Sequence, residues 1–143
     1  MTRNLILALA VMTALLAGGA VLARNIDCPG GLCTGTKKAD SLVGTAGDDE
    51  IVGRGGNDTL IGDPATSTGD DLLRGGGGND AISDPFDGAD VDTVFGGKGN
   101  DTINVREGAS GGDDPDVVDC GPGTDTVVVD PTDIRLNCEI LNP

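Results

Sequence analysis

Glycine-rich stretches that end in aspartate recur along the chain and have the chemistry to bind a hard cation. Residues 75–83 read GGGGNDAIS, and residues 96–104 repeat the pattern as GGKGNDTIN. Glycine lacks a Cβ and tolerates positive φ, so such a turn can direct successive backbone carbonyls toward one point. The aspartate adds a carboxylate. Calcium takes about 6–8 oxygen ligands of these two kinds, so the pattern indicates calcium binding.

The composition favours binding over catalysis. Of the 24 acidic residues only Glu50, Glu107 and Glu139 are glutamate, and the net charge is −15. Glutamate is equally charged and the better helix former, so the aspartate bias favours turns or a hard cation. Histidine is absent, which excludes catalytic triads and His-containing zinc sites. The strong negative charge predicts repulsion of nucleic acid and of anionic membranes.

A periodic unit organises these residues. Two residues after each of nine aspartates the chain carries an aliphatic residue, and five of the eight steps between the aspartates are nine residues long. A disordered linker has no reason to keep that phase. Each unit is predicted to be a six-residue turn ending in aspartate, followed by a three-residue strand whose middle residue points inward. These middle residues are Leu42, Ile51, Leu60, Leu73, Ile82, Val94, Ile103, Val118 and Val127.

Over about residues 35–128 the unit resembles the repeats-in-toxin, or hemolysin-type, calcium-binding repeat G-G-x-G-x-D-x-U-x. The resemblance implies an all-β fold, a right-handed parallel β-roll (a solenoid). Two units would make one coil, with several calcium ions held between turns stacked along each edge. Many members of this family carry an enzymatic or pore-forming domain and a C-terminal secretion signal. We expect neither feature in this chain, and toxicity is therefore not expected of it.

If consecutive units alternate sides, the aspartates fall on two edges. The odd edge has Asp40, Asp58, Asp80, Asp101 and Asp125, and the even edge has Asp49, Asp71, Asp92 and Asp116. We expect all nine to be metal ligands, together with the turn glycines Gly53, Gly55, Gly56, Gly75, Gly76, Gly78, Gly96, Gly97 and Gly99.

The two edges are expected to differ in regularity. The odd edge has compact turns, although 35–40 lacks the inner glycine and should form a less regular site. The even edge contains three inserted stretches, at 63–69, 84–90 and roughly 105–115, so we expect weaker sites there, with Asp48, Asp70 and Asp90 as additional ligands. The inserted loops near Phe86 are the expected surface for an extracellular or cell-surface partner; the alternative is neutral variation of surface loops.

The N-terminus and the cysteines indicate export. Residues 1–23 combine Arg3, an apolar run and small residues before Ala23, as in a signal peptide, with an uncleaved membrane anchor as the alternative. In an oxidising compartment four cysteines allow three pairings. We favour Cys28–Cys33 and Cys120–Cys138, because each pair brackets one end of the repeats. A metal-thiolate site is the rival, but the cysteine spacings do not suit it.

These inferences combine into one prediction. A signal peptide (1–23) precedes an N-terminal cap with a cysteine pair (24–34), the calcium-binding β-roll (35–128) and a C-terminal cap strand (129–143) in which Ile134 and Leu136 alternate. The core is thin, so calcium is expected to drive folding. The predicted function is a secreted, extracellular calcium-binding protein and not an enzyme. The alternative is a structural or adhesive protein in which calcium is only structural.

Overall fold

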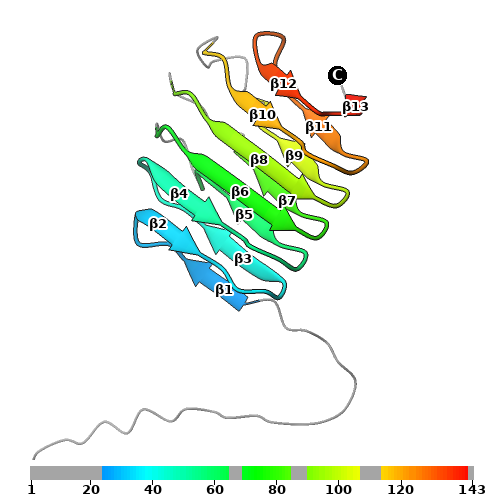
Figure 1. Cartoon of the computed structure of the whole chain (residues 1–143). Coiled ribbons are helices and arrows are strands. Elements are labelled where there is room, and N and C mark those ends of the chain that lie inside the picture. Colours follow the sequence, from blue (N-terminus) through cyan, green and yellow to red (C-terminus); the bar gives the residue numbers. More distant parts are fainter. Residues whose placement is uncertain (1–23, 65–68, 85–89, 107–113, 142–143) are drawn as a thin grey trace, which may run out of the picture.

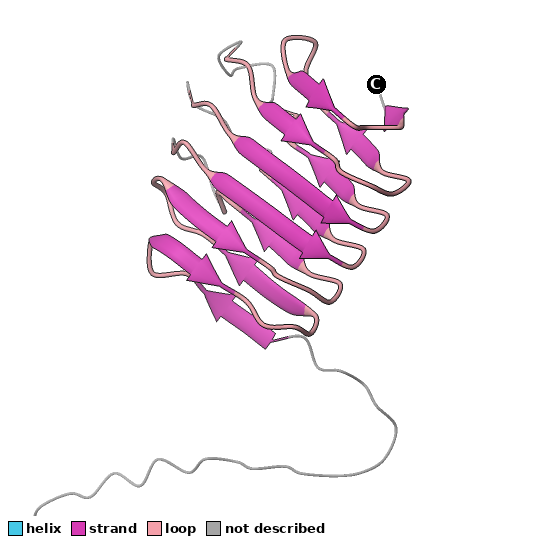
Figure 2. Cartoon of the chain, viewed as in Figure 1, coloured by secondary structure: helices cyan, strands magenta, loops and turns pink. Residues whose placement is uncertain are grey.

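The protein is a solenoid of two parallel β-sheets, seen in a computed structural model that describes residues 24–64, 69–84, 90–106 and 114–141 (Figures 1 and 2). The strands of the seven-stranded sheet are β1 (Arg24–Asp27), β3 (Asp40–Val43), β5 (Thr59–Ile61), β7 (Ala81–Ser83), β9 (Thr102–Asn104), β11 (Thr126–Val128) and β13 (Ile140–Leu141). The strands of the six-stranded sheet are β2 (Gly31–Thr34), β4 (Asp49–Val52), β6 (Leu72–Gly77), β8 (Thr93–Lys98), β10 (Val117–Asp119) and β12 (Ile134–Leu136).

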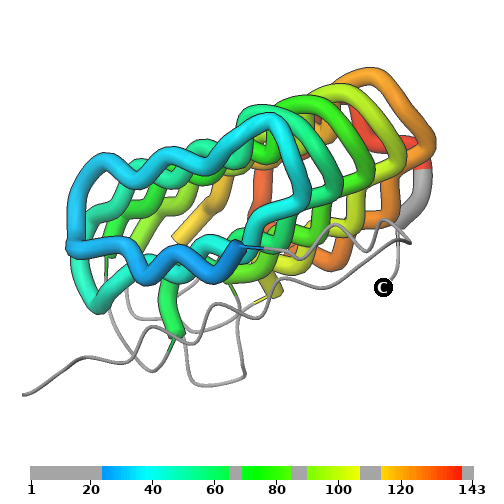
Figure 3. The backbone as a smooth tube through the Cα atoms, turned by 90° about the horizontal axis from the view of Figure 1, so that it is seen from below, coloured from blue at the N-terminus to red at the C-terminus, as the bar shows by residue number. Residues whose placement is uncertain are grey.

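Consecutive strands belong to opposite sheets, so each pair of strands makes one coil. Figure 3 shows the coils stacked along one axis. Every strand pairing is parallel, and equivalent positions of the repeat lie in register. In the seven-stranded sheet Leu60 pairs with Leu42 and Ile82, and in the six-stranded sheet Leu73 pairs with Ile51 and Val94. The predicted β-roll with two units per coil is confirmed.

The core is a single narrow layer between the sheets. All nine predicted strand residues are buried, with exposed fractions of 0–1%. Their neighbours on each strand face outward, as the two-residue period of a strand requires. Among the described residues only a few further apolar side chains, Val105, Val129 and three of the cysteines, are buried beside them. The prediction of a thin aliphatic core is therefore confirmed.

Four strands of the repeat region are longer than the predicted three residues, and β3 and β4 contain four residues each. β6 and β8 each contain six, because their glycine-rich turns also pair: Gly76 lies opposite Gly97, and Gly77 opposite Lys98. Turns of equal length can stack with the same register as the strands before them, so the extended backbone continues into the turn. The predicted ends of β6 and β8 were wrong because the sequence of one glycine run does not show that it pairs with the glycine run of the next coil.

Both ends are closed by disulfide bonds. Cys28 is bonded to Cys33 and Cys120 to Cys138, which confirms the favoured pairing. The first bond joins the end of β1 to β2, and both strands extend the sheets ahead of the first repeat. At the other end, Ile134 and Leu136 of β12 pair with Val117 and Asp119, and both are about half exposed on the outer face.

Several predictions concern residues outside the described part of the chain. These are the signal peptide at 1–23, Phe86 and much of each inserted stretch. Within the described residues no helix is long and apolar enough to cross a membrane.

The single-layer core makes each of its side chains costly to remove. We expect Ile82→Ala to lower the free energy of unfolding by about 2–5 kcal/mol, because the cavity is lined by backbone that cannot collapse into it. Ser83→Ala, at the neighbouring outward position, should change it by less than about 0.5 kcal/mol. Urea unfolding of both variants in calcium measures the difference. Equal losses would contradict the assignment of inward and outward positions.

Candidate metal centres

The odd-edge aspartates form a hydrogen-bonded ladder that runs along the solenoid. The backbone N–H of each aspartate donates to Oδ1 of the equivalent aspartate one coil later, at 2.8 Å in every case. The ladder runs from Asp40 through Asp58, Asp80 and Asp101 to Asp125. Because the strands are in register, the carboxylates repeat once per coil, and the ladder fixes one oxygen of each.

The second oxygen of these carboxylates lacks a donor. Oδ2 is buried in Asp58, Asp80, Asp101 and Asp125, and no described residue donates a hydrogen bond to it. These side chains are at most 3% exposed. A buried carboxylate oxygen without a donor costs several kcal/mol unless a proton or a cation satisfies it. A row of such oxygens therefore fits a row of cations.

Backbone carbonyls lie beside the same oxygens. A Cβ built at Gly96 would lie 2.7 Å from Oδ2 of Asp101 and 2.5 Å from the carbonyl oxygen of Cys120 in the next coil. At Gly75 the corresponding carbonyl, that of Gly96, would lie 2.5 Å away, and Oδ2 of Asp80 would collide with the Cβ. Carboxylate and carbonyl oxygens thus approach one point beside the first glycine of the turn, which is the donor set that calcium prefers.

The glycines of these turns are required by conformation as well as by space. Gly76 and Gly97 have φ of 110° and 106°, and Gly78 and Gly99 have φ of 133° and 127°. A side chain is strained there. A Cβ at Gly99 would also collide with the carbonyl oxygen of Gly78 in the coil before it. The glycine runs therefore form turns of defined backbone conformation and are not flexible linkers.

Threonine donates to one oxygen of each carboxylate in the first coil, whereas Oδ1 of Asp49 is buried without a donor among the described residues. Oδ2 of Asp40 accepts hydrogen bonds from the backbone N–H and the hydroxyl of Thr36, at 2.6 and 2.7 Å. Oδ2 of Asp49 accepts the same pair from Thr45, at 2.6 and 2.9 Å. A less regular site was predicted at Asp40 and weaker sites on the even edge, but the threonine donors were not predicted. The signal was a threonine directly after the first glycine of both turns.

The even edge carries a parallel ladder. The N–H groups of Asp49, Asp71 and Asp92 donate to Oδ1 of the aspartate one coil later, ending on Asp116, at 2.8–2.9 Å. Oδ2 of Asp71 is buried and has no donor among the described residues. The inserted turns therefore leave the register of the aspartates unchanged.

The additional even-edge aspartates make hydrogen bonds between coils. Oδ1 of Asp48 accepts from the N–H of Asp70 at 3.2 Å, and Oδ1 of Asp70 accepts from the N–H of Val91 at 3.0 Å. Oδ2 of Asp90 accepts from the N–H of Gly69 at 3.1 Å. These three carboxylates hold neighbouring turns together in the structure.

A row of asparagine side chains likewise links neighbouring turns of the odd edge by hydrogen bonds. The N–H groups of Asn79, Asn100 and Thr124 donate to the side-chain oxygens of Asn57, Asn79 and Asn100 in the preceding coil, at 2.9–3.0 Å. This direction is opposite to that of the aspartate ladder, whose N–H groups donate to the following coil. The Asn-Asp pairs of the sequence thus bind each turn to both of its neighbours.

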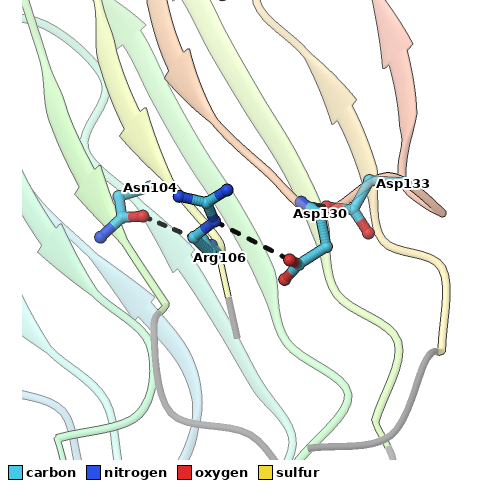
Figure 4. A network of polar contacts seen from close by, with 4 residues as sticks. All are labelled: Asn104, Arg106, Asp130 and Asp133. Atoms are coloured by element: carbon cyan, nitrogen blue, oxygen red, sulfur yellow. Dashed lines mark hydrogen bonds and ion pairs between the residues drawn. The ribbon is translucent and has the colours of Figure 1, made fainter. Parts of the chain in front are cut away.

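Acidic residues of the C-terminal segment end both ladders, which sequence reasoning missed. Asp133 accepts the N–H of Asp116 at 3.2 Å and that of Asp130 at 2.6 Å. Figure 4 shows Asp133 beside Asp130, which forms an ion pair with Arg106 (Nε to Oδ1, 3.8 Å). On the odd edge Glu139 accepts the N–H of Asp125 at 3.3 Å.

Burial controls the electrostatics of both rows. It raises the pKa of Asp71 to about 7 and that of Asp80 to about 6, although a backbone hydrogen bond opposes each shift. Neighbouring aspartates raise both values further. Burial likewise raises the pKa of Asp58 and Asp101. Among the described residues no group of three or more acidic, histidine or cysteine side chains is arranged to hold a metal, so the backbone carbonyls must complete any site.

The comparison with known families agrees with this geometry. The family model for the RTX calcium-binding nonapeptide repeat (4 copies) matches residues 34–64, 65–83 and 86–109. The matched segments include the turns of both edges. No curated protein matches the sequence.

The raised pKa values predict an unusual acid response of the calcium-free protein. Folding that raises a carboxyl pKa above about 3.9 makes the native state bind more protons, so stability falls as pH rises through the folded pKa. With folded values of about 6 for Asp80 and about 7 for Asp71, the loss should occur between about pH 4 and pH 7.

Thermal unfolding of calcium-free protein, followed by circular dichroism from pH 4 to pH 8, measures this dependence. We expect the melting temperature to fall across that interval and Asp71→Asn to flatten the upper part of the curve. A melting temperature that rises with pH would contradict the prediction.

Proposed function

Because the chain belongs to the RTX calcium-binding nonapeptide repeat family, we propose that it is an extracellular protein whose stacked turns bind several calcium ions and whose folding depends on them. The ligands are the carboxylates of the two aspartate rows and the carbonyls of the glycine-rich turns. Bound calcium supplies positive charge between carboxylates that otherwise face one another.

One observation carries this proposal. The buried Oδ2 atoms of Asp58, Asp80 and Asp101 lack donors, and each belongs to a turn whose first glycine also lies beside a carbonyl oxygen of the next coil. Asp80 is central, because its N–H donates to Asp101 and its Oδ1 accepts from Asp58. The regular sites are therefore proposed between the coils of Asp58, Asp80, Asp101 and Asp125. The Asp40 carboxylate, already satisfied by Thr36, contributes least.

The proposed extracellular location rests on the two disulfide bonds and on residues 1–23. Structural disulfides persist in oxidising compartments, and both pairs of cysteines are bonded. Extracellular calcium is abundant enough to occupy sites of modest affinity, since extracellular modules bind at about 10⁻⁴–10⁻³ M.

Calcium dependence of folding is the first test. Removal of calcium at pH 7.5 should convert the circular dichroism spectrum from β-structure to disordered chain, because the two rows of carboxylates then repel one another around a thin core. Adding calcium back should restore the spectrum, whereas magnesium, which dehydrates reluctantly and demands six ligands in a near-ideal octahedron, should be far less effective. A β spectrum unchanged by chelation would refute the folding role.

Calcium stoichiometry tests the assignment of ligands. Asp80→Asn should reduce the number of ions bound per chain by at least one, because its Oδ2 is a proposed ligand. Asp40→Asn is the matched control at the equivalent position and should leave the number unchanged, since Thr36 already satisfies that oxygen. Isothermal titration calorimetry measures both. If both variants lost the same number of calcium ions, the proposal that the Asp40 carboxylate contributes least would be contradicted.

A structural or adhesive role is the second candidate. Leu32, Ile134 and Leu136 are 66%, 50% and 47% exposed, and all lie on the six-stranded sheet at its two ends. Exposed apolar residues of this size favour contact with another surface. Affinity separates the candidates: calcium sites that stay filled far below extracellular calcium concentrations would favour the structural role, and sites that empty near those concentrations would favour a calcium-responsive one.

A further inference from the structure

Asp84 is a carboxylate in a row of core positions that otherwise contain glycine or valine. The row is formed by the residue that follows β3, β5, β7, β9 and β11: Gly44, Gly62, Asp84, Val105 and Val129. Backbone hydrogen bonds link the coils here, as from the N–H of Asp84 to the carbonyl of Asn104 at 2.9 Å. Asp84 is 4% exposed, much like Val105 at 0%. A charge at such a position is costly unless it is compensated.

The two oxygens of Asp84 have different environments. Oδ1 accepts a hydrogen bond from the backbone N–H of Asp63 at 3.1 Å. Oδ2 is buried and has no donor among the described residues. A Cβ built at Gly62 would collide with this oxygen and would lie 2.5 Å from Oδ2 of Asp71, which also lacks a donor. Two buried carboxylate oxygens from neighbouring coils therefore approach the same point beside Gly62.

Among the described residues no positive side chain forms an ion pair with Asp71 or Asp84. The ion pairs of the described residues join Arg74 to Glu50 and Arg106 to Asp130, and neither involves Asp71 or Asp84. Burial raises the pKa of Asp84 strongly, and the neighbouring charges of Asp92, Asp71 and Asp63 raise it further. Only a proton or a cation can satisfy oxygens in such surroundings.

We propose that Asp84 and Asp71 together bind one calcium ion beside Gly62, on the edge that carries the inserted turns. The assignment rests on the proposed calcium-binding function but uses a ligand that the nonapeptide motif does not supply. In the motif the aspartate ends the turn, whereas Asp84 begins one, at the position that Gly53 and Gly75 occupy on the opposite edge. A second carboxylate thus takes the place of the carbonyl oxygen that lies beside Gly53 and Gly75.

The absence of a side chain at Gly62 and the charge of the donor set both favour an ion here. Calcium–oxygen distances of about 2.3–2.6 Å require open space beside the two carboxylates, and a residue larger than glycine would fill it. Two carboxylates provide more negative charge than a carboxylate with a carbonyl, and affinity in calcium sites rises with that charge. The inserted edge therefore has at least one strong site, in contrast to the expectation that insertion weakens it.

Calcium titration of two Asp84 variants tests the proposal. Asp84→Val introduces the residue that the next two coils carry in this row, and Asp84→Asn keeps the shape while removing the charge. We expect each variant to bind one calcium ion fewer per chain than the wild type by isothermal titration calorimetry. Asp27→Asn, which removes one charge from the exposed outer face of β1, is the matched control and should bind the wild-type number.

Thermal unfolding separates a lost ligand from a damaged fold. Without calcium at pH 5, where we expect the calcium-free protein to be folded, Asp84→Val should melt at or above the wild-type temperature, because a buried carboxyl is gone. With calcium, its gain in melting temperature should be smaller than that of the wild type. Wild-type stoichiometry in both Asp84 variants would overturn this site while leaving the proposed function intact; a wild type that binds no calcium would overturn both.

Discussion

Parallel stacking in register is the constraint on which the other features depend. Because the coils stack in register, equivalent residues lie above one another. The aspartates at one position of the repeat therefore form a row, spaced like neighbouring strands at about 4.8 Å. The first oxygen of each carboxylate is satisfied by the backbone of the adjacent coil. In Asp58, Asp71, Asp80, Asp101 and Asp125 the second oxygen is buried without a donor among the described residues. The same register that builds the sheets thus accumulates negative charge along both edges.

The hydrogen-bond partners of the carboxylates differ along the solenoid. In the first coil, Thr36 and Thr45 donate to Oδ2 of Asp40 and Asp49. At the last coil, Asp133 and Glu139 accept the final ladder N–H groups and end the rows. Most of the buried carboxylate oxygens without a donor among the described residues therefore belong to the coils between these ends, which are closed by disulfides.

The two edges place different oxygens beside the first glycine of the turn. On the odd edge, equal turns allow the glycine backbones to stack, so a carbonyl of one coil lies near the carboxylate of another. On the even edge, the inserted turns change which residue begins each turn, and Asp84 places a side-chain oxygen in that position. Insertion therefore changes the source of the oxygen without removing it. A solenoid tolerates such variation because each coil contacts only its neighbours.

The sequence by itself determined the fold class, the inward residues and the two edges, because a nine-residue period with an aliphatic residue two places after each aspartate admits few other arrangements. It also favoured the observed disulfides, since each cysteine pair brackets one end of the repeats. Only the tertiary structure decided which aspartates keep an unsatisfied oxygen. Asp84 and Asp133 lie close in sequence to turns that look alike, and their roles depend on which atoms of the neighbouring coil face them. That contact spans about 20 residues of chain, a separation at which local sequence pattern carries no information about hydrogen-bond partners.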